Sequence, residues 1–319
     1  MNIVFMGTPE FACVPLISLV TSRHQILAVV TGADKQAGRG RKLLQTPVKQ
    51  EAVKHGLSVL SPVSLKSEDL YQALAGLHAD LFVVVAFRIL PERLFQLPRL
   101  GSINIHGSLL PKYRGAAPIN WALINGETET GLSAFFLKRT VDTGDVILQE
   151  KTSIDPDETF DSLYARMSAM AGPFLLQTLD IIESGGYRAI PQDDAHASAA
   201  PKITPFNATI DFGLPAGHVR NFVRGLATRP GAMTSFRGKR VKILACKLAG
   251  IETNSDARPG TVLPDRKHLL VQCAHSAVEL TKVVPEGRGD MDGVSFINGF
   301  RLRPGEVFGE VCKGDKEIK

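Results

Sequence analysis

A carboxamide, an imidazole and a carboxylate stand in two short polar stretches of this sequence. Asn104 and His106 lie in the stretch Asn-Ile-His-Gly-Ser-Leu-Leu-Pro, and Asp142 lies in Thr-Val-Asp-Thr-Gly-Asp. Residues two apart on an extended chain project from the same face, so Asn104 and His106 can reach one substrate atom. Two N–H donors on one oxygen stabilise a tetrahedral oxyanion by about 3–4 kcal/mol per donor in known cases. The first stretch therefore indicates a site where an oxyanion could form.

Asp142 would add proton transfer to this chemistry. A carboxylate beside His106 could accept or relay a proton from an attacking amine, and histidine itself exchanges protons near neutral pH. The same residues also allow a structural interpretation, in which Asn104 caps a strand, His106 is a buried and satisfied side chain, and Asp-Thr-Gly-Asp is an ordinary turn. Taken alone, these residues leave both interpretations open.

The elements around the two stretches follow the pattern of a doubly wound α/β sheet, with short apolar runs alternating with helical stretches. We expect strands at 2–6, 26–31, 59–60, 79–87 and 102–106. In open α/β sheets, ligands bind beyond the carboxyl ends of the strands. The residues that follow Ala86 and those around His106 are therefore the favoured positions for a site.

Helices are expected at 11–22 and at 159–184, and the apolar side of the second is more typical of core packing than of a cofactor surface. Thr46 is a capping residue with proline at the first helical position, and Gly56 stops that helix. Before it, residues 36–42 read Gln-Ala-Gly-Arg-Gly-Arg-Lys. This composition predicts a basic loop rather than a regular element.

The pattern changes in the last third of the chain. Small residues and prolines at 195–205 indicate a linker, and short strands punctuated by turns follow at 233–237, 241–245, 261–263, 269–273 and 278–283. A small β-barrel of about five strands is the simplest architecture for this spacing. We therefore expect a catalytic domain at 1–190, a linker at 191–206 and a β-barrel domain at 207–319.

Charge and composition limit the classes of protein that the chain can belong to. Its 319 residues carry a formal net charge of +5, with 19 basic against 20 acidic residues at 1–204 and 18 against 12 at 205–319. The net charge of the last part is thus +6, which alone is a weak signal for nucleic acid. The four cysteines lie far apart without C-x-x-C spacing, so we predict no metal site. Without a secretory signal or a membrane-length apolar run, we expect a cytoplasmic monomer that binds no membrane.

The residues resemble a known family. Asn104 and His106 with the following Ser-Leu-Leu-Pro, and then Val-Asp-Thr-Gly at 141–144, resemble the signature of the folate-dependent formyltransferases. Longer strings resemble the members of that family that act on methionyl-tRNA. They are Phe-Met-Gly-Thr-Pro-Glu-Phe at 5–11, Ala-Gly-Arg-Gly at 37–40, Gly-Ser-Leu-Leu-Pro-Lys-Tyr-Arg-Gly-Ala-Ala-Pro at 107–118, Pro-Gly-Ala at 230–232, Gly-Lys-Arg at 238–240 and Asn-Gly-Phe-Arg at 298–301. The resemblance covers nearly the whole chain.

This resemblance implies a Rossmann-like formyltransferase domain that binds 10-formyltetrahydrofolate, joined to an OB-like β-barrel domain that helps to hold tRNA. The implied reaction moves the formyl group to the α-amino group of methionyl initiator tRNA, for translation initiation. Matching positions give the catalytic residues as Asn104, His106 and Asp142. The implied folate contacts are Ser108, Leu109, Leu110, Pro111, Phe87 and Ile89. The implied tRNA contacts are Arg39, Arg41, Lys42, Lys239 and Arg240.

The sequence departs from the family pattern at one place, lacks a dinucleotide motif and leaves two alternatives open. Many family members carry a tyrosine-glycine pair after the central strand, where this chain has Ala86-Phe87-Arg88. The opening Gly7-Thr-Pro-Glu is not the G-x-G-x-x-G dinucleotide fingerprint, so the expected sheet does not argue for NAD. One alternative is a folate-dependent formyltransferase that acts on a small amine. The other is an RNA-binding protein whose α/β domain is catalytically silent.

Overall fold

The computed structural model describes residues 1–37, 42–253 and 257–309, and the chain divides into two compact units. The first unit comprises Met1–Pro118, Glu129–Ser153 and Tyr164–Ala200, and the second comprises Ile119–Thr128, Ile154–Leu163 and the chain from Pro201 onward. The linker expected at 191–206 stays a prediction. Within the described ranges, no helix is long and apolar enough to cross a membrane.

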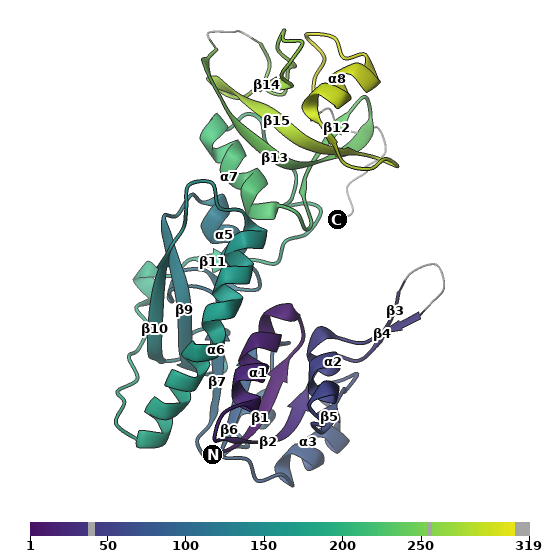
Figure 1. Cartoon of the computed structure of the whole chain (residues 1–319). Coiled ribbons are helices and arrows are strands. Elements are labelled where there is room, and N and C mark those ends of the chain that lie inside the picture. Colours follow the sequence, from purple (N-terminus) through teal and green to yellow (C-terminus); the bar gives the residue numbers. More distant parts are fainter. Residues whose placement is uncertain (38–41, 254–256, 310–319) are drawn as a thin grey trace. The chain divides into compact units, whose positions relative to one another are not determined.

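A seven-stranded sheet forms the centre of the first unit (Figure 1). Its strands are β1 (Asn2–Gly7), β2 (Gln25–Val30), β5 (Val59–Leu60), β6 (Leu81–Val85), β7 (Ser102–His106), β9 (Glu129–Phe136) and β10 (Val146–Ser153). Their order is β10-β9-β7-β6-β1-β2-β5. Neighbouring strands from β7 to β5 in this order pair parallel, whereas β9 pairs antiparallel with β7 and β10 pairs antiparallel with β9. The chain reverses its direction of travel across the sheet after β5 and returns to the far side of β1. The doubly wound prediction is confirmed.

Helices cover both faces of this sheet because its central strands are apolar on both sides. They are α1 (Cys13–Val20), α2 (Pro47–Lys54), α3 (Glu68–Ala75), α4 (Glu92–Phe95) and α6 (Phe160–Ser184), with short 3₁₀ turns η1 (Glu10–Ala12) and η2 (Asp194–His196). Leu74 of α3 and Leu94 of α4 pack in one cluster with Met6 and Val84 of the sheet. On α6, a side chain at Gly172 would strike Ser18 of α1, so this glycine lets the two helices approach closely.

The basic loop predicted at 36–42 needs a correction. Residues Lys35–Ala37 form β3 and Lys42–Leu44 form β4, and the two strands pair antiparallel as a hairpin. The stretch is therefore partly regular, because backbone pairing between its ends does not depend on apolar alternation in the side chains. Residues 38–41 lie outside the described part of the chain.

The second unit is built around a small β-barrel. Its strands are β12 (Ala232–Phe236), β13 (Lys239–Glu252), β14 (Leu270–Gln272), β15 (Ser276–Pro285) and β16 (Met291–Asp292), and its helices include α7 (Ala216–Leu226) and α8 (Gly293–Phe300). The sheet order is β12-β13-β15-β14. Single bridges join Val271 of β14 to Val262, Thr261 to Val307, and Phe308 back to Phe236 of β12, which closes the ring. The predicted barrel is confirmed, and its core holds Phe236, Phe296 and Phe308.

Three separate chain segments contribute to this second unit. The helix α5 (Pro118–Ile124) supplies Asn120, whose amide donates to the Gly225 carbonyl of α7 at 2.8 Å. Arg224 of α7 donates to the Glu158 carbonyl at 3.1 Å. The second unit therefore consists mostly of the chain after residue 205, together with two earlier segments that the sequence pattern did not indicate.

Candidate active site

Strand β7 carries Asn104 and His106 to the carboxyl edge of the sheet. Asn104 lies opposite Val84 of β6 and Phe135 of β9, and it is half-buried. His106 is the last residue of β7, and its side chain is only 6% exposed. The strand is extended at both positions, so the two side chains leave the same face of the sheet.

The His106 ring is held by a backbone carbonyl. Its Nε2 lies 2.9 Å from the Tyr113 carbonyl oxygen, and the Phe135 ring packs edge-on against it. Because a carbonyl only accepts, Nε2 must carry a proton in this contact. The other nitrogen, Nδ1, lies 3.9 Å from Oδ2 of Asp142. This distance is too long for a hydrogen bond, and the two groups form an ion pair only when the ring is protonated.

Asp142 reaches His106 from a tight turn. Its φ is 55°, in the left-handed region that few residues other than glycine adopt. Its Oδ2 accepts a hydrogen bond from the Gly115 N–H at 2.8 Å, and its side chain is 10% exposed. At Gly144, a side chain would strike the Phe136 carbonyl oxygen. The Asp-Thr-Gly-Asp segment is thus a turn, as one interpretation held, and it also places its carboxylate beside His106.

The segment expected to contact folate is fixed by polar side chains that the sequence did not single out. The Ser133 hydroxyl donates to the Ser108 carbonyl at 2.6 Å and accepts from the Leu110 N–H at 3.0 Å. Gln149 donates to the Leu110 carbonyl at 2.9 Å. The side chains of Ser108 and Leu110 are buried, so they stabilise the conformation of this segment. The sequence does not indicate a role for Ser133 or Gln149, because the strands that carry them were not predicted.

The other residues that are expected to contact folate expose apolar surface. Phe87 is half-buried against the core cluster beneath it, and Ile89 is 74% exposed. Both residues follow β6, the strand next to β7. Leu109 and Pro111 are also half-buried. Arg88 donates to the carbonyls of Pro62 and Val63, which fixes the segment after β6. Such apolar surface beside hydrogen-bonding groups fits a flat ring system.

The expected tRNA contacts fall in two places. Arg39 and Arg41 lie outside the described residues, and Lys42 is the first residue of β4. Lys239 and Arg240 are exposed at the start of β13 in the second unit. Their role stays a prediction.

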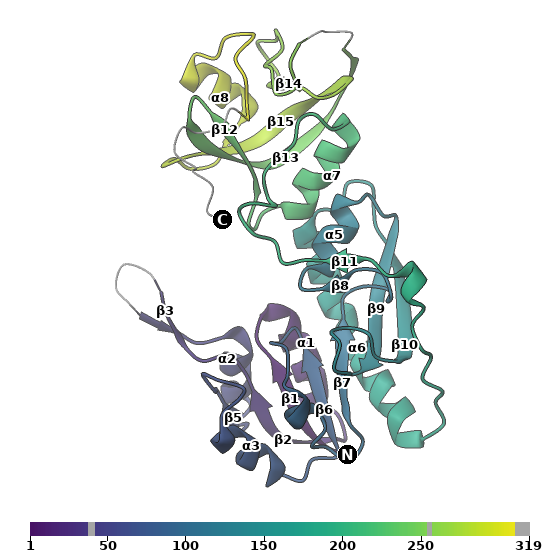
Figure 2. The same cartoon turned by 180° about the vertical axis from the view of Figure 1, so that it is seen from behind.

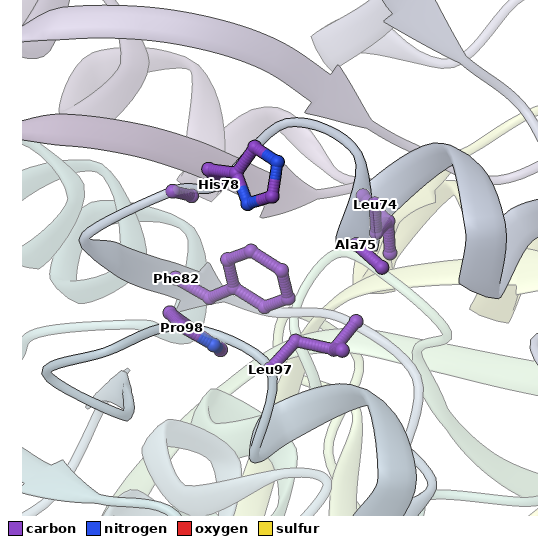
Figure 3. A pocket seen from close by; sticks show the side chains of 7 residues that line it. Leu74, Ala75, His78, Phe82, Leu97 and Pro98 are labelled. Atoms are coloured by element: carbon purple, nitrogen blue, oxygen red, sulfur yellow. The ribbon is translucent and has the colours of Figure 1, made fainter.

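A small pocket lies at the other edge of the sheet (Figure 3). It is lined by Leu74, Ala75, His78, Ala79, Phe82, Leu97 and Pro98. Ala79 and Pro98 precede β6 and β7, so the pocket sits at the amino ends of these strands. Since His106 ends β7, the pocket is separate from the candidate active site.

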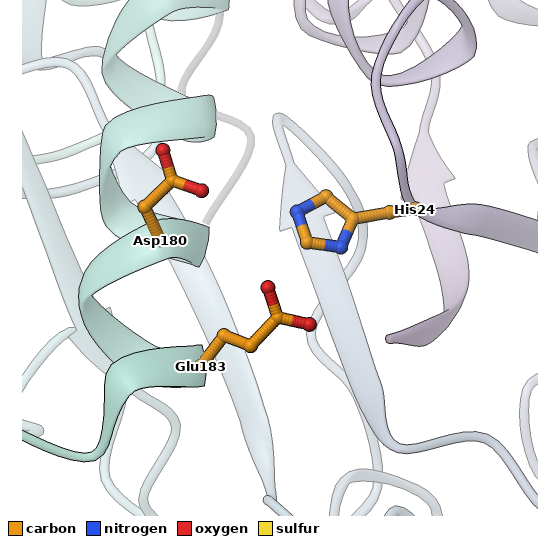
Figure 4. A group of neighbouring side chains, drawn as sticks. All are labelled: His24, Asp180 and Glu183. Carbon is orange, nitrogen blue, oxygen red and sulfur yellow. The ribbon is translucent and has the colours of Figure 1, made fainter.

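Within the described ranges, His24, Asp180 and Glu183 form a group whose possible ligand atoms lie within 4.8 Å of one another (Figure 4). The Arg23 guanidinium contacts Asp180 and Glu183 at 2.7 Å each. It also holds the pKa of Glu183 below its usual range. The two carboxylates therefore already have a cationic partner, and this group does not argue for a metal ion.

A side chain missed by the sequence analysis reaches the turn at Asp142. Gln192 donates to the carbonyls of Asp142 and Gly144, at 2.9 and 2.8 Å. It comes from a segment that the sequence interpretation assigned to the linker. No spacing rule connects it to Asp142, which lies 50 positions earlier.

Comparison with known proteins identifies the class to which this fold belongs. The sheet of the first unit has the fold of the formyl transferases. Residues 1–179 match the family described as formyl transferase, and residues 202–301 match the formyl transferase C-terminal domain. The fold is also similar to that of an N-formyltransferase from Helicobacter canadensis, in complex with folinic acid and dTDP-3-aminofucose, which superposes with a TM-score of 0.65 at 18% identity. That alignment covers 87% of this chain and 98% of that one.

Curated relatives narrow the class. The methionyl-tRNA formyltransferase of Geotalea uraniireducens is 38% identical over 312 residues, covering 97% of this chain and 98% of the relative. The corresponding protein of Geobacter sulfurreducens is 40% identical over 312 residues, covering 97% of each chain. This chain belongs to the methionyl-tRNA formyltransferase family.

Proposed function

We propose that this protein transfers the formyl group of 10-formyltetrahydrofolate to the α-amino group of methionyl initiator tRNA. Full-length similarity to the curated relatives carries this proposal, and the grouping of His106 with Asp142 beside Asn104 supports it. The reaction serves translation initiation in the cytoplasm. Folate supplies the activated formyl group, and the chain supplies the groups that bind, orient and exchange protons.

In the proposed mechanism, the neutral amine attacks the formyl carbon and forms a tetrahedral intermediate. Asn104 and His106 stabilise its oxygen through N–H donors. Since the Tyr113 carbonyl occupies Nε2, His106 donates through Nδ1 in its protonated form. The Asp142 carboxylate, 3.9 Å from Nδ1, offsets the charge of that ring.

Asp142 also helps to move a proton from the attacking nitrogen to N10 of the folate, through water. The bond from carbon to N10 then breaks, and N10 departs with this proton while the amine keeps the formyl group. An amine is already a competent nucleophile, so no covalent enzyme intermediate is required.

The decisive experiment incubates the purified protein with 10-formyltetrahydrofolate and charged initiator tRNA, and then measures blocking of the methionine amine. We expect rapid formylation. A small amine, such as an amino sugar nucleotide, serves as the competing acceptor. Equal rates with that acceptor would favour the small-amine alternative, and a failure to bind folate saturably would favour the silent RNA-binding protein.

A further inference from the structure

The Gln192 side chain joins two parts of the active-site region with a defined orientation. Its Oε1 accepts from Nε and Nη2 of Arg114, at 3.0 and 2.8 Å. Its Nε2 donates to the carbonyls of Asp142 and Gly144. A guanidinium only donates and a carbonyl only accepts, so the amide can satisfy all four contacts in one orientation only.

These contacts close into a ring. Arg114 is followed by Gly115, whose N–H donates to the Asp142 carboxylate at 2.8 Å. Arg114 and Gly115 form β8 (Arg114–Gly115), which pairs with β11 (Ala199–Ala200), and the two lie side by side in Figure 2. The segment from Gln192 to β11 therefore holds both the carboxylate of Asp142, through Gly115, and its backbone, through Gln192.

The backbone of Asp142 needs such support. Asp142 has a φ of 55°, in the left-handed region that residues with a side chain seldom adopt, and such a backbone persists where surrounding contacts determine it. The two carbonyls that Gln192 holds lie on either side of Thr143, so they fix the turn that aims the carboxylate. The Arg114 side chain, 16% exposed, keeps Gln192 in place.

We propose that Gln192 is a positioning residue, which acts through Asp142 by holding its carboxylate toward His106. This role rests on the proposed function, in which Asp142 stabilises the protonated ring and assists proton transfer. Gln192 does not touch the substrate in this proposal. Its contribution should therefore appear in kcat rather than in substrate binding.

Gln192→Glu is the sharpest test, because glutamate keeps the acceptor for Arg114 while it loses both donors to the turn. We expect kcat for formylation to fall about 100-fold, the size of loss that small misplacements of a catalytic group cause. The KM for folate and for tRNA should change little. Asp194→Asn is the matched control, since Asp194 is 80% exposed and contacts the same guanidinium from outside the ring. Its kcat should stay close to that of the unmodified protein.

Crystal structures of Gln192→Glu and of the neutral variant Gln192→Met provide a readout that does not depend on activity. The Asp142 carboxylate should lie farther from His106 Nδ1 than the present 3.9 Å in both. Unchanged kcat, or a carboxylate that keeps its place in both variants, would overturn the proposal. If the unmodified protein formylates no acceptor, the proposed function fails, while the crystal structures still decide whether Gln192 positions Asp142.

Discussion

In the proposed mechanism, proton transfer depends on the carboxylate of Asp142. It is almost fully buried, accepts the Gly115 N–H and faces His106. Replacement by asparagine preserves the size of the side chain and an oxygen that can still accept from Gly115. It removes the negative charge that the proposed mechanism assigns to Asp142 beside His106.

We therefore expect Asp142→Asn to lower the rate of formylation by about 10²–10⁴-fold, the usual contribution of a general acid or base. The Kd for tRNA should be nearly unchanged, because no phosphate contact is lost. Single-turnover formylation and filter binding measure the two quantities. Asp145→Asn is the control, since Asp145 lies in the same turn and pairs with Lys138 at the surface. Full turnover by Asp142→Asn would remove Asp142 from the mechanism.

The cysteines give a second prediction at the residue scale. Burial raises the pKa of Cys246 and of Cys273 to about 12, and that of Cys13 to about 11. Only the thiolate reacts readily, so these side chains should be alkylated slowly by iodoacetamide at neutral pH. Mass spectrometry after timed alkylation measures each site, and the protein unfolded in urea provides the fast reference. Rapid labelling of Cys273 in the folded protein would contradict the burial described here.

Which residues of the site are predictable depends on how each one makes its contacts. Asn104, His106 and Asp142 have distinctive side chains in short polar stretches, so the sequence points to them as candidates. Tyr113 and Gln192 act on or through backbone carbonyls. Every residue carries a backbone carbonyl, so the sequence alone does not indicate which carbonyls take part in these contacts.

At the scale of single elements, the start of α2 illustrates a local signal that the fold retains. The Thr46 hydroxyl accepts from the Lys49 N–H at 3.1 Å, and it also lies 2.7 Å from the hydroxyl of the buried Thr31. Pro47 opens the helix with a suitable φ, and its missing N–H is not needed there. The cap predicted from Thr46 and Pro47 is confirmed.

Thr46→Ala should lower the free energy of unfolding by about 1 kcal/mol, the typical value of an N-cap side chain. Urea denaturation followed by circular dichroism measures this change. Thr46→Ser keeps the oxygen and should restore most of the stability. Equal losses in both variants would mean that the methyl group, rather than the cap, is responsible.

The sequence predicts elements well where one physical signal dominates. The central strands β1, β6 and β7 are short apolar runs between turn residues, and all three were expected. Strand β9 reads Glu-Thr-Gly-Leu-Ser-Ala-Phe-Phe, without clean alternation, because residues 130–135 are buried on both faces of the sheet. The hairpin of β3 and β4 was not predicted, because glycine and charged residues in that stretch are typical of a loop. Pairing with a neighbour, not composition, defines these elements.

At the scale of the whole molecule, the uneven charge bears on how strongly tRNA binding should depend on salt. The net charge of +6 at 205–319 should attract phosphates, and each Lys or Arg contact releases counterions from the nucleic acid. Raising the salt concentration should therefore raise the Kd for tRNA steeply.

Filter binding across a salt series measures this slope. The double variant Lys239→Gln and Arg240→Gln should show a shallower slope if these two exposed residues contact phosphates, with thermal unfolding as the check on folding. An identical slope would exclude both residues from the contact surface, and a flat response in the unmodified protein would argue against phosphate binding altogether.

Truncation experiments must respect the three chain segments that build the second unit. A fragment that begins at residue 207 would retain α7 and the barrel but would lack Asn120 and Glu158. The buried Gly225 carbonyl would lose its donor, while Arg224 would lose its contacts to the carbonyls of Asp155 and Glu158 and keep only Asn221. A buried carbonyl left unpaired costs roughly 1–3 kcal/mol. Dividing the gene near residue 206 would thus split one folded body, and weak RNA binding by the resulting piece would report damage rather than the absence of a binding surface.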